Sequence, residues 1–151
     1  ISSILAYLGC QVDLLEQNEV VYALLEDGLK RAQTSANTAT QALAEKLNLL
    51  PRQSAQAYLA STAQHYDVVY VDPMFPERQK SAKVKKAMQY LHDVAGIASF
   101  AQECELLALA IACAKKRVVV KRPRLAPLLA DRKPTHQLLG KTIRYDVYLS
   151  L

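Results

Sequence analysis

The run Asp72-Pro73-Met74-Phe75-Pro76 follows the apolar segment 67–71. It is the strongest candidate in the sequence for a catalytic or binding site. The Asp72 carboxylate and the Pro73 carbonyl would offer two adjacent hydrogen-bond acceptors, which match the two hydrogens of an exocyclic amine. The Phe75 ring would give a flipped base a face for stacking, a contact worth about 1–3 kcal/mol. The alternative is that Asp-Pro only ends a strand and that Phe75 belongs to the core. The proline-stiffened context after an apolar strand favours the site.

Glu16 stands at the end of the first segment with strand character, residues 11–16. A carboxylate at that place can accept hydrogen bonds from both hydroxyl groups of a ribose, as acidic residues do in dinucleotide-binding folds. The alternative is a solvated glutamate at the end of a strand, and position alone favours that alternative.

The basic residues are unevenly distributed along the chain. The formal net charge is +5, but residues 1–70 carry −3 and residues 71–151 carry +8. A basic half suits a polyanion such as nucleic acid, although ordinary solvated lysines would explain the charge equally well. Two basic groups follow predicted strands, so we expect them to contact phosphates at one edge, with some lysines of the first group on a solvated helix face. These groups are Arg78, Lys80, Lys83, Lys85 and Lys86, and then Lys121, Arg122 and Arg124.

The composition excludes several classes of protein. Of the 151 residues, 51% are hydrophobic and 22% are charged, so the chain can bury a core and is not a disordered tail. The longest uncharged apolar run, residues 106–114, is far shorter than the roughly 18 residues of a membrane span. The three cysteines lie far apart in apolar context and the three histidines lack ligand spacing. This pattern predicts buried thiols in a cytoplasmic protein and neither a metal site nor a cysteine nucleophile.

Strand and helix patterns alternate, which predicts an α/β fold with an open, mostly parallel sheet covered on both faces. Such sheets bind ligands at the carboxyl ends of their strands, here Glu16, the turn 52–54 and the segment from Asp72. The last strand alternates apolar and polar residues, as a half-exposed antiparallel strand does. Expected strands are 11–16, 47–50, 67–71, 118–121 and 142–149; expected helices are 1–8, 20–32, 42–46, 54–64, 82–94 and 100–114, with a loop or frayed helix at 33–41.

Glycine is scarce, and its positions carry information. The four glycines, Gly9, Gly28, Gly96 and Gly140, are too far apart to form a phosphate-binding loop or a complete G-x-G-x-x-G pattern. Residues 1–8 already read as an apolar helix without a preceding cap, which is unusual at the start of a domain. We therefore expect the chain to be part of a longer domain.

The segment from Asp72 to Pro76 resembles the [Asn/Asp]-Pro-Pro-[Phe/Tyr] motif of S-adenosylmethionine-dependent methyltransferases that act on exocyclic amines. The resemblance extends over nearly the whole chain and is weakest at 33–64. It is carried by LGCQVDLLEQNEVVYALLEDGLKRA, VVYVDPMFPERQKSAKVKK, KRVVVKRP and IRYDVYL. Together these segments resemble the ribosomal RNA small subunit methyltransferase J family.

This resemblance implies a Rossmann-like methyltransferase fold with a mostly parallel sheet and an antiparallel C-terminal strand. It implies S-adenosylmethionine as cofactor and methylation of the N2 amine of one guanosine near the 3′ end of 16S ribosomal RNA. The expected partner is therefore 16S ribosomal RNA or the small ribosomal subunit, in the cytoplasm. The expected domain is residues 1–151 as part of a methyltransferase domain whose glycine-rich loop precedes Ile1. No oligomeric state is predicted.

The same resemblance assigns roles to individual residues. Glu16 and Gln17 match family positions that hold the ribose and adenine of the cofactor, the second being usually arginine. Ser54 matches one serine of a pair on the adenine side, where Gln53 replaces the other. Asp72 matches both a cofactor contact and the first residue of the catalytic motif.

The implied chemistry depends on the amine nitrogen, whose lone pair is delocalised into the base. Hydrogen bonds from its two N–H groups to Asp72 and the Pro73 carbonyl would favour a more nucleophilic nitrogen and fix its approach. The departing proton could pass to Asp72 or to water. The same pair of acceptors would also suit adenine N6 or cytosine N4, and an RNA-binding protein that retains the fold without catalysis is a further alternative.

Overall fold

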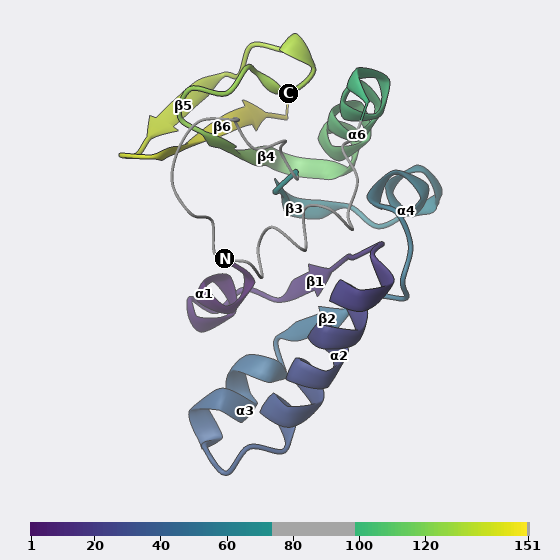
Figure 1. Cartoon of the computed structure of the whole chain (residues 1–151), viewed down its shortest axis with the longest axis vertical. Coiled ribbons are helices and arrows are strands. Elements are labelled where there is room, and N and C mark those ends of the chain that lie inside the picture. The colour runs from purple at the N-terminus through teal and green to yellow at the C-terminus, as the bar shows by residue number, and fades with distance from the viewer. Residues whose placement is uncertain (74–98, 151) are drawn as a thin grey trace. The chain divides into compact units, whose positions relative to one another are not determined.

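The computed structural model describes residues 1–73 and 99–150, which form two compact units, Ile1–Tyr58 and Leu59–Leu151 (Figure 1). Several predictions lie outside the described residues: the expected helix 82–94, the site residues Phe75, Arg78 and Lys80, and the roles expected for Lys83, Lys85 and Lys86.

The N-terminal unit contains a small parallel sheet and helices. Strand β1 pairs with β2 in parallel, with Val12 opposite Leu47 and Leu14 opposite Leu49. Both strands were expected, although β1 is shorter than the predicted 11–16. The elements are α1 (Ser2–Tyr7), β1 (Val12–Leu14), α2 (Glu19–Gln33), α3 (Thr38–Ala44) and β2 (Leu47–Leu49), and α4 (Ala55–Ser61) begins in this unit.

Asparagine side chains cap the amino ends of helices α2 and α3. The Asn18 side chain accepts hydrogen bonds from the first backbone N–H groups of α2, and Asn37 does the same for α3. The cap at Asn37 turns part of the segment predicted as a loop or frayed helix, 33–41, into the regular start of α3. These local signals place the turn between β1 and α2, in which Glu16 lies.

The C-terminal unit contains a four-stranded sheet with the order β3-β4-β6-β5. Strands β3 and β4 are parallel, and β6 is antiparallel to both of its neighbours, which confirms the predicted antiparallel C-terminal strand. Strand β5 was not predicted. The elements are β3 (Tyr66–Val71), α6 (Phe100–Cys113), β4 (Ala114–Pro123), the 3₁₀ turn η1 (Leu129–Asp131), β5 (His136–Leu139) and β6 (Ile143–Leu149).

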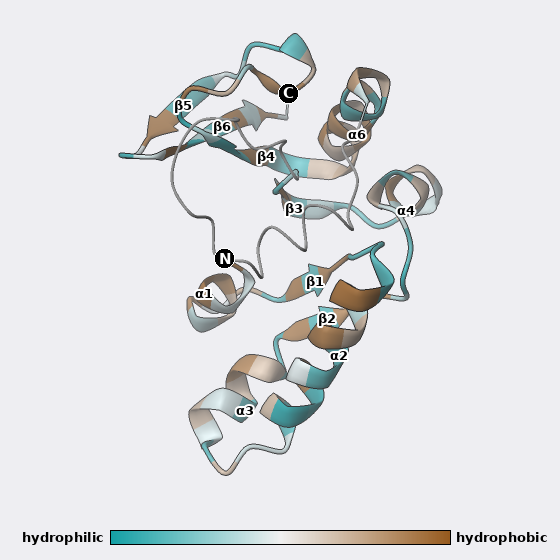
Figure 2. Ribbon diagram, in the orientation of Figure 1, coloured by the Kyte–Doolittle hydropathy of each residue, from teal (hydrophilic) through white to brown (hydrophobic). Residues whose placement is uncertain are grey.

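Helix α6 and the middle of β4 form the apolar core of this unit. Leu107 and Ala110 of α6 and Val118 and Val120 of β4 are fully buried. A capping box at Ser99 begins the helix, and most of its residues are hydrophobic (Figure 2). None of the helices in the described part of the chain has the length and apolar character to cross a bilayer.

Two strands differ from expectation in what they bury. The segment at β3 was predicted as a buried strand, but Val68 is 45% exposed and only Val71 is buried within it. In β6 the polar residues were expected to face solvent, yet Arg144 and Asp146 are buried. The reason for the second difference is that Arg144 and Asp146 are hydrogen-bonded to each other inside the unit.

Candidate functional site

The carboxyl ends of β3 and β4 lie side by side, because the two strands are parallel and pair regularly from Val68 to Val71. Val71 is opposite Val120, so the next residues, Asp72 and Lys121, are neighbours. The Lys121 Nζ atom lies 2.9 Å from Asp72 Oδ2. The side chains of Lys121 and Asp72 are 34% and 46% exposed, so solvent and ligands can reach the carboxylate. The structure thus joins the predicted catalytic aspartate to a lysine predicted to bind phosphate.

Pro73 follows Asp72 and is half-buried. Below the aspartate, burial raises the pKa of the Tyr70 phenol, and the negative charge of Asp72 raises it further. Tyr70 is therefore neutral at every physiological pH and is not a candidate base. The Asp72 carboxylate is the exposed acidic group at this strand end.

Arg122 does not lie on the surface, which corrects the prediction that it contacts phosphate. Its side chain is 2% exposed, and its Nε and Nη2 atoms donate to the Pro127 carbonyl at 3.0 and 2.7 Å. Glu103 lies 3.8 Å from its guanidinium. Burial lowers the pKa of Arg122, while Glu103 opposes that shift. Arg122 holds the chain that follows β4.

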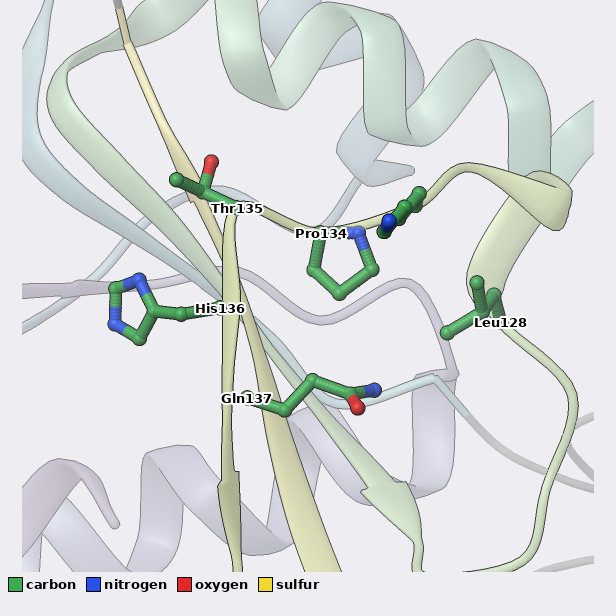
Figure 3. Close-up of a pocket in the computed structure, with 6 residues that line it drawn as sticks. Leu128, Pro134, Thr135, His136 and Gln137 are labelled. Atoms are coloured by element: carbon green, nitrogen blue, oxygen red, sulfur yellow. The ribbon is translucent and has the colours of Figure 1, made fainter.

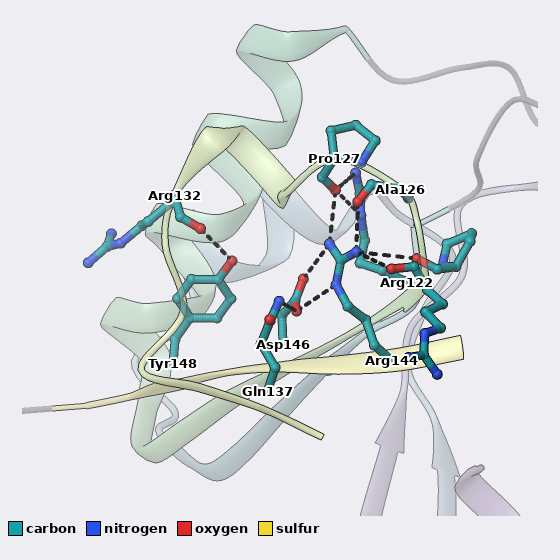
Figure 4. Close-up of polar contacts among 10 residues, drawn as sticks. Arg122, Ala126, Pro127, Arg132, Gln137, Arg144, Asp146 and Tyr148 are labelled. Atoms are coloured by element: carbon teal, nitrogen blue, oxygen red, sulfur yellow. Dashed lines mark hydrogen bonds and ion pairs between the residues drawn. The ribbon is translucent and has the colours of Figure 1, made fainter. Parts of the chain in front are cut away.

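Arg144 of β6 is buried and also binds the segment that follows β4 (Figure 4). Its guanidinium pairs with Asp146 at 2.9 and 3.1 Å and donates to the carbonyls of Arg124 and Ala126 at 2.8 and 2.7 Å. Further carbonyls, those of Pro123 and Pro127, lie at 3.4 and 3.2 Å. A buried charge is tolerated only when it is paired and hydrogen-bonded, and this network meets both conditions.

Two further side-chain hydrogen bonds lie near this network. The Gln137 side chain donates to Asp146 Oδ1 at 2.6 Å, which ties β5 to β6. The Tyr148 hydroxyl donates to the Arg132 carbonyl at 3.0 Å, and burial raises the pKa of Tyr148. The spacing Arg144-x-Asp146 puts opposite charges on one face of a strand, a signal that could have revealed the network in the sequence.

A shallow pocket of about 460 Å³ opens beside the start of β5 and was not predicted (Figure 3). Its polar lining comes from Lys133, Thr135, His136 and Gln137, and its apolar lining from Leu128 and Pro134. The pocket is built on the antiparallel side of the sheet rather than on the β3–β4 pair. We assign it no role.

In the N-terminal unit, the loops after β1 and β2 meet at one edge. The backbone N–H of Asn18 donates to Glu16 Oε1 at 2.7 Å, which fixes the half-buried carboxylate at the start of α2. Arg52 donates to the Gln17 carbonyl at 3.2 Å, and Ser54 Oγ accepts from the N–H of Ala57 at 3.1 Å. The predicted cofactor residues of this unit therefore belong to two loops joined by a hydrogen bond.

No group of three potential ligands in residues 1–73 and 99–150 could hold a metal ion. The three cysteines are unpaired thiols. Cys113 is buried and lies 3.5 Å from the Leu59 carbonyl, as expected for a thiol in the core. Cys10 is exposed, so the prediction of a buried thiol is wrong at this position, which lies just after the end of α1.

Known proteins resemble this chain over almost its whole length. A family model described as "Putative SAM-dependent methyltransferase" matches residues 2–150. Over 149 residues the chain is 46% identical to the ribosomal RNA small subunit methyltransferase J of Cellvibrio japonicus, covering 96% of this chain and 55% of the relative. The chain belongs to this family of SAM-dependent methyltransferases.

Further members and a solved structure agree with this assignment. The ribosomal RNA small subunit methyltransferase J of Neisseria gonorrhoeae is 47% identical over 150 residues, covering 98% of this chain and 58% of the relative. The crystal structure of a SAM-dependent methyltransferase from Neisseria gonorrhoeae matches with a TM-score of 0.76 and 41% identity, covering 99% of this chain and 56% of that one. The α/β methyltransferase fold is thus shown. The chain spans slightly more than half the length of the curated relatives it matches.

The residues predicted to contact the cofactor can be compared with the chemical groups of S-adenosylmethionine. The Glu16 carboxylate is held in place and is an acceptor suited to ribose hydroxyls. The Ser54 hydroxyl accepts from Ala57, so its own hydrogen can be donated to an adenine nitrogen. Gln17 is exposed and offers an amide. This set of groups fits a nucleoside cofactor.

Proposed function

We propose that the protein transfers a methyl group from S-adenosylmethionine to the exocyclic N2 amine of a guanosine in 16S ribosomal RNA. One observation carries the proposal: an exposed carboxylate, Asp72, directly follows β3 and is followed by Pro73, in a chain of this family. The names of the relatives support a small-subunit ribosomal RNA as the substrate class.

The proposed role of the protein residues is to bind and orient the amine. The Asp72 carboxylate and the Pro73 carbonyl each accept one N–H of the amine, and together they fix the direction of its lone pair. Negative charge on Asp72 stabilises the positive charge that develops on the nitrogen as the new N–C bond forms. Asp72 or water then takes the proton. Phe75 is proposed to stack on the target base.

S-adenosylmethionine, when bound, supplies an electrophilic methyl group on a sulfonium sulfur. We propose that Glu16, Gln17 and Ser54 contact its nucleoside part and that Asp72 is a further contact. The hydrogen bonds that already fix Glu16 and Ser54 support this part of the proposal, because preorganised groups lose little conformational entropy on binding.

The proposed partner is 16S ribosomal RNA or the small ribosomal subunit, and the proposed place of action is the cytoplasm. Arg78 and Lys80 are proposed to contact RNA phosphates, since they follow the catalytic motif within the basic part of the chain. Arg122 is left out of this set because it is buried.

The test uses the full-length protein, small ribosomal subunits with unmodified 16S ribosomal RNA, and S-adenosylmethionine labelled in its methyl group. We expect label in the RNA, and N2-methylguanosine after digestion to nucleosides. Label in N6-methyladenosine or N4-methylcytidine would instead assign another exocyclic amine. Binding of subunits without any label would point to an RNA-binding protein without catalysis.

A further inference from the structure

Two aspartate–lysine pairs bridge the parallel strands β3 and β4, one near each end. Near the amino ends, Lys116 Nζ lies 3.0 Å from Asp67 Oδ1, and at the carboxyl ends Lys121 Nζ lies 2.9 Å from Asp72 Oδ2. The chemical groups and the distances are nearly the same. The Asp67–Lys116 pair is therefore a matched control for experiments on the Asp72–Lys121 pair.

The surroundings of the two lysines differ. The Lys116 side chain is 63% exposed, whereas that of Lys121 is 34% exposed. Lys121 also stands directly before the buried Arg122, whose contacts with Pro127 hold the following chain. Lys121 thus reaches the carboxylate from a strand end whose next residue is anchored, and its side chain is less exposed than that of Lys116.

We infer that Lys121 is a positioning residue for methyl transfer, which holds the Asp72 carboxylate by its Oδ2 atom so that Oδ1 accepts an N–H of the target amine. This inference rests on the proposed function. A carboxylate with one oxygen held cannot rotate freely, so the acceptor for the amine is in place before RNA binds. It also replaces the predicted role of Lys121 as a phosphate contact, which the experiment tests as the opposing outcome.

The two roles of Lys121 affect different kinetic constants. A positioning residue acts on the bound complex, so Lys121→Met lowers kcat on the order of 10-fold while KM for the small subunit stays within about 2-fold. A phosphate contact acts on binding, so the same variant raises KM and reduces the salt dependence of binding by about one counterion.

The experiment measures kcat, KM for unmodified small subunits and the salt dependence of binding for the full-length wild type, Lys121→Met and Lys121→Arg. Lys116→Met is the matched control, because it breaks the equivalent pair away from Asp72 and is expected to keep the wild-type constants. Lys121→Arg retains a donor for Asp72 and is expected to recover part of kcat. Thermal unfolding of each variant checks that the fold is retained.

A second arm compares Asp72→Asn with the double variant Asp72→Asn/Lys121→Met by single-turnover methyl transfer. If Lys121 acts only through the carboxylate, the second substitution has no further effect on the residual rate. An unchanged or higher kcat for Lys121→Met, a rise confined to KM, or full additivity in the double variant would overturn the inference. A wild-type protein that transfers no methyl group overturns the proposed function itself, a result distinguishable from an active wild type with an unaffected Lys121→Met.

Discussion

The amino and carboxyl ends of the β3–β4 pair carry similar charges in different structural settings. At the amino end the register between the strands shifts between Tyr66 and Val68, and residues 115–117 of β4 are all exposed. At the carboxyl end the pairing is regular up to Val71 and Val120, and buried residues alternate with half-buried ones from Val118 to Arg122 of β4. At the carboxyl end, buried arginines also hold the chain that follows β4.

This difference shows that the role of an ion pair depends on the residues around it. Exposed aspartate–lysine pairs contribute little net stability, so neither pair is needed to hold the strands together. At the carboxyl end, however, Arg122 and Arg144 bind the carbonyls of the following chain and make the strand end a fixed platform. The carboxylate on that platform is the one for which we propose a catalytic role.

The largest expected effect is the loss of activity in Asp72→Ala. Removing the acceptor that stabilises developing charge should lower kcat for methyl transfer on the order of 1,000-fold. The fold should be retained, because Asp72 is exposed and follows the strand. Asp67→Ala at the other end is the control and should retain activity. Near-normal turnover of Asp72→Ala would break the comparison and the site assignment with it.

A large effect on stability is expected for Arg144→Met, which removes the support of the carboxyl end. It leaves Asp146 buried without its partner and several carbonyls without a donor, a loss of about 3 kcal/mol in the free energy of unfolding. Urea unfolding of the full-length protein measures this loss. Arg117→Met, which alters an exposed arginine of β4, should unfold like the wild type. Equal midpoints for the two variants would contradict a supporting role of the buried network.

A smaller effect on stability is expected when either lysine of the two β3–β4 ion pairs is replaced. Lys121→Met and Lys116→Met should each shift the urea midpoint only slightly and by similar amounts, because both pairs are exposed to solvent. A strong destabilisation by Lys121→Met alone would mean that this pair holds the fold, and the proposed positioning role would then lose its support.

The smallest expected effect concerns pH at the amino end. The hydrogen bond and charge of Lys116 lower the pKa of Asp67 below its ordinary value of 3.8 in the folded protein. The pair therefore adds stability above that value and loses it as the pH falls through the lower, folded pKa. The difference in urea midpoint between wild type and Asp67→Asn should be small at pH 7 and shrink further at pH 3. A difference that grows on acidification would show that the sign is wrong.

Much of the fold could be predicted because it follows from local patterns. The apolar runs at β3, β4 and α6 lie where the sequence places them, although β4 extends well beyond the predicted 118–121 at both ends. Strand β5 was missed since its four residues are all exposed and it is held by pairing with β6, a contact that no local pattern records.

The sequence by itself determined the family, the α/β order of elements and the identity of Asp72 and Pro73 as the motif after an apolar strand. Only the tertiary structure decided which charged side chains are buried and which groups they contact. It buried Arg122 and Arg144 around the carbonyls after β4 and joined Lys121 to Asp72. The physical reason is that hydrogen-bond partners of a buried charge come from distant segments, which local spacing does not show. A basic residue in a list of charges can thus be a ligand for RNA, a partner for a carboxylate or a support for a loop, and packing selects among these.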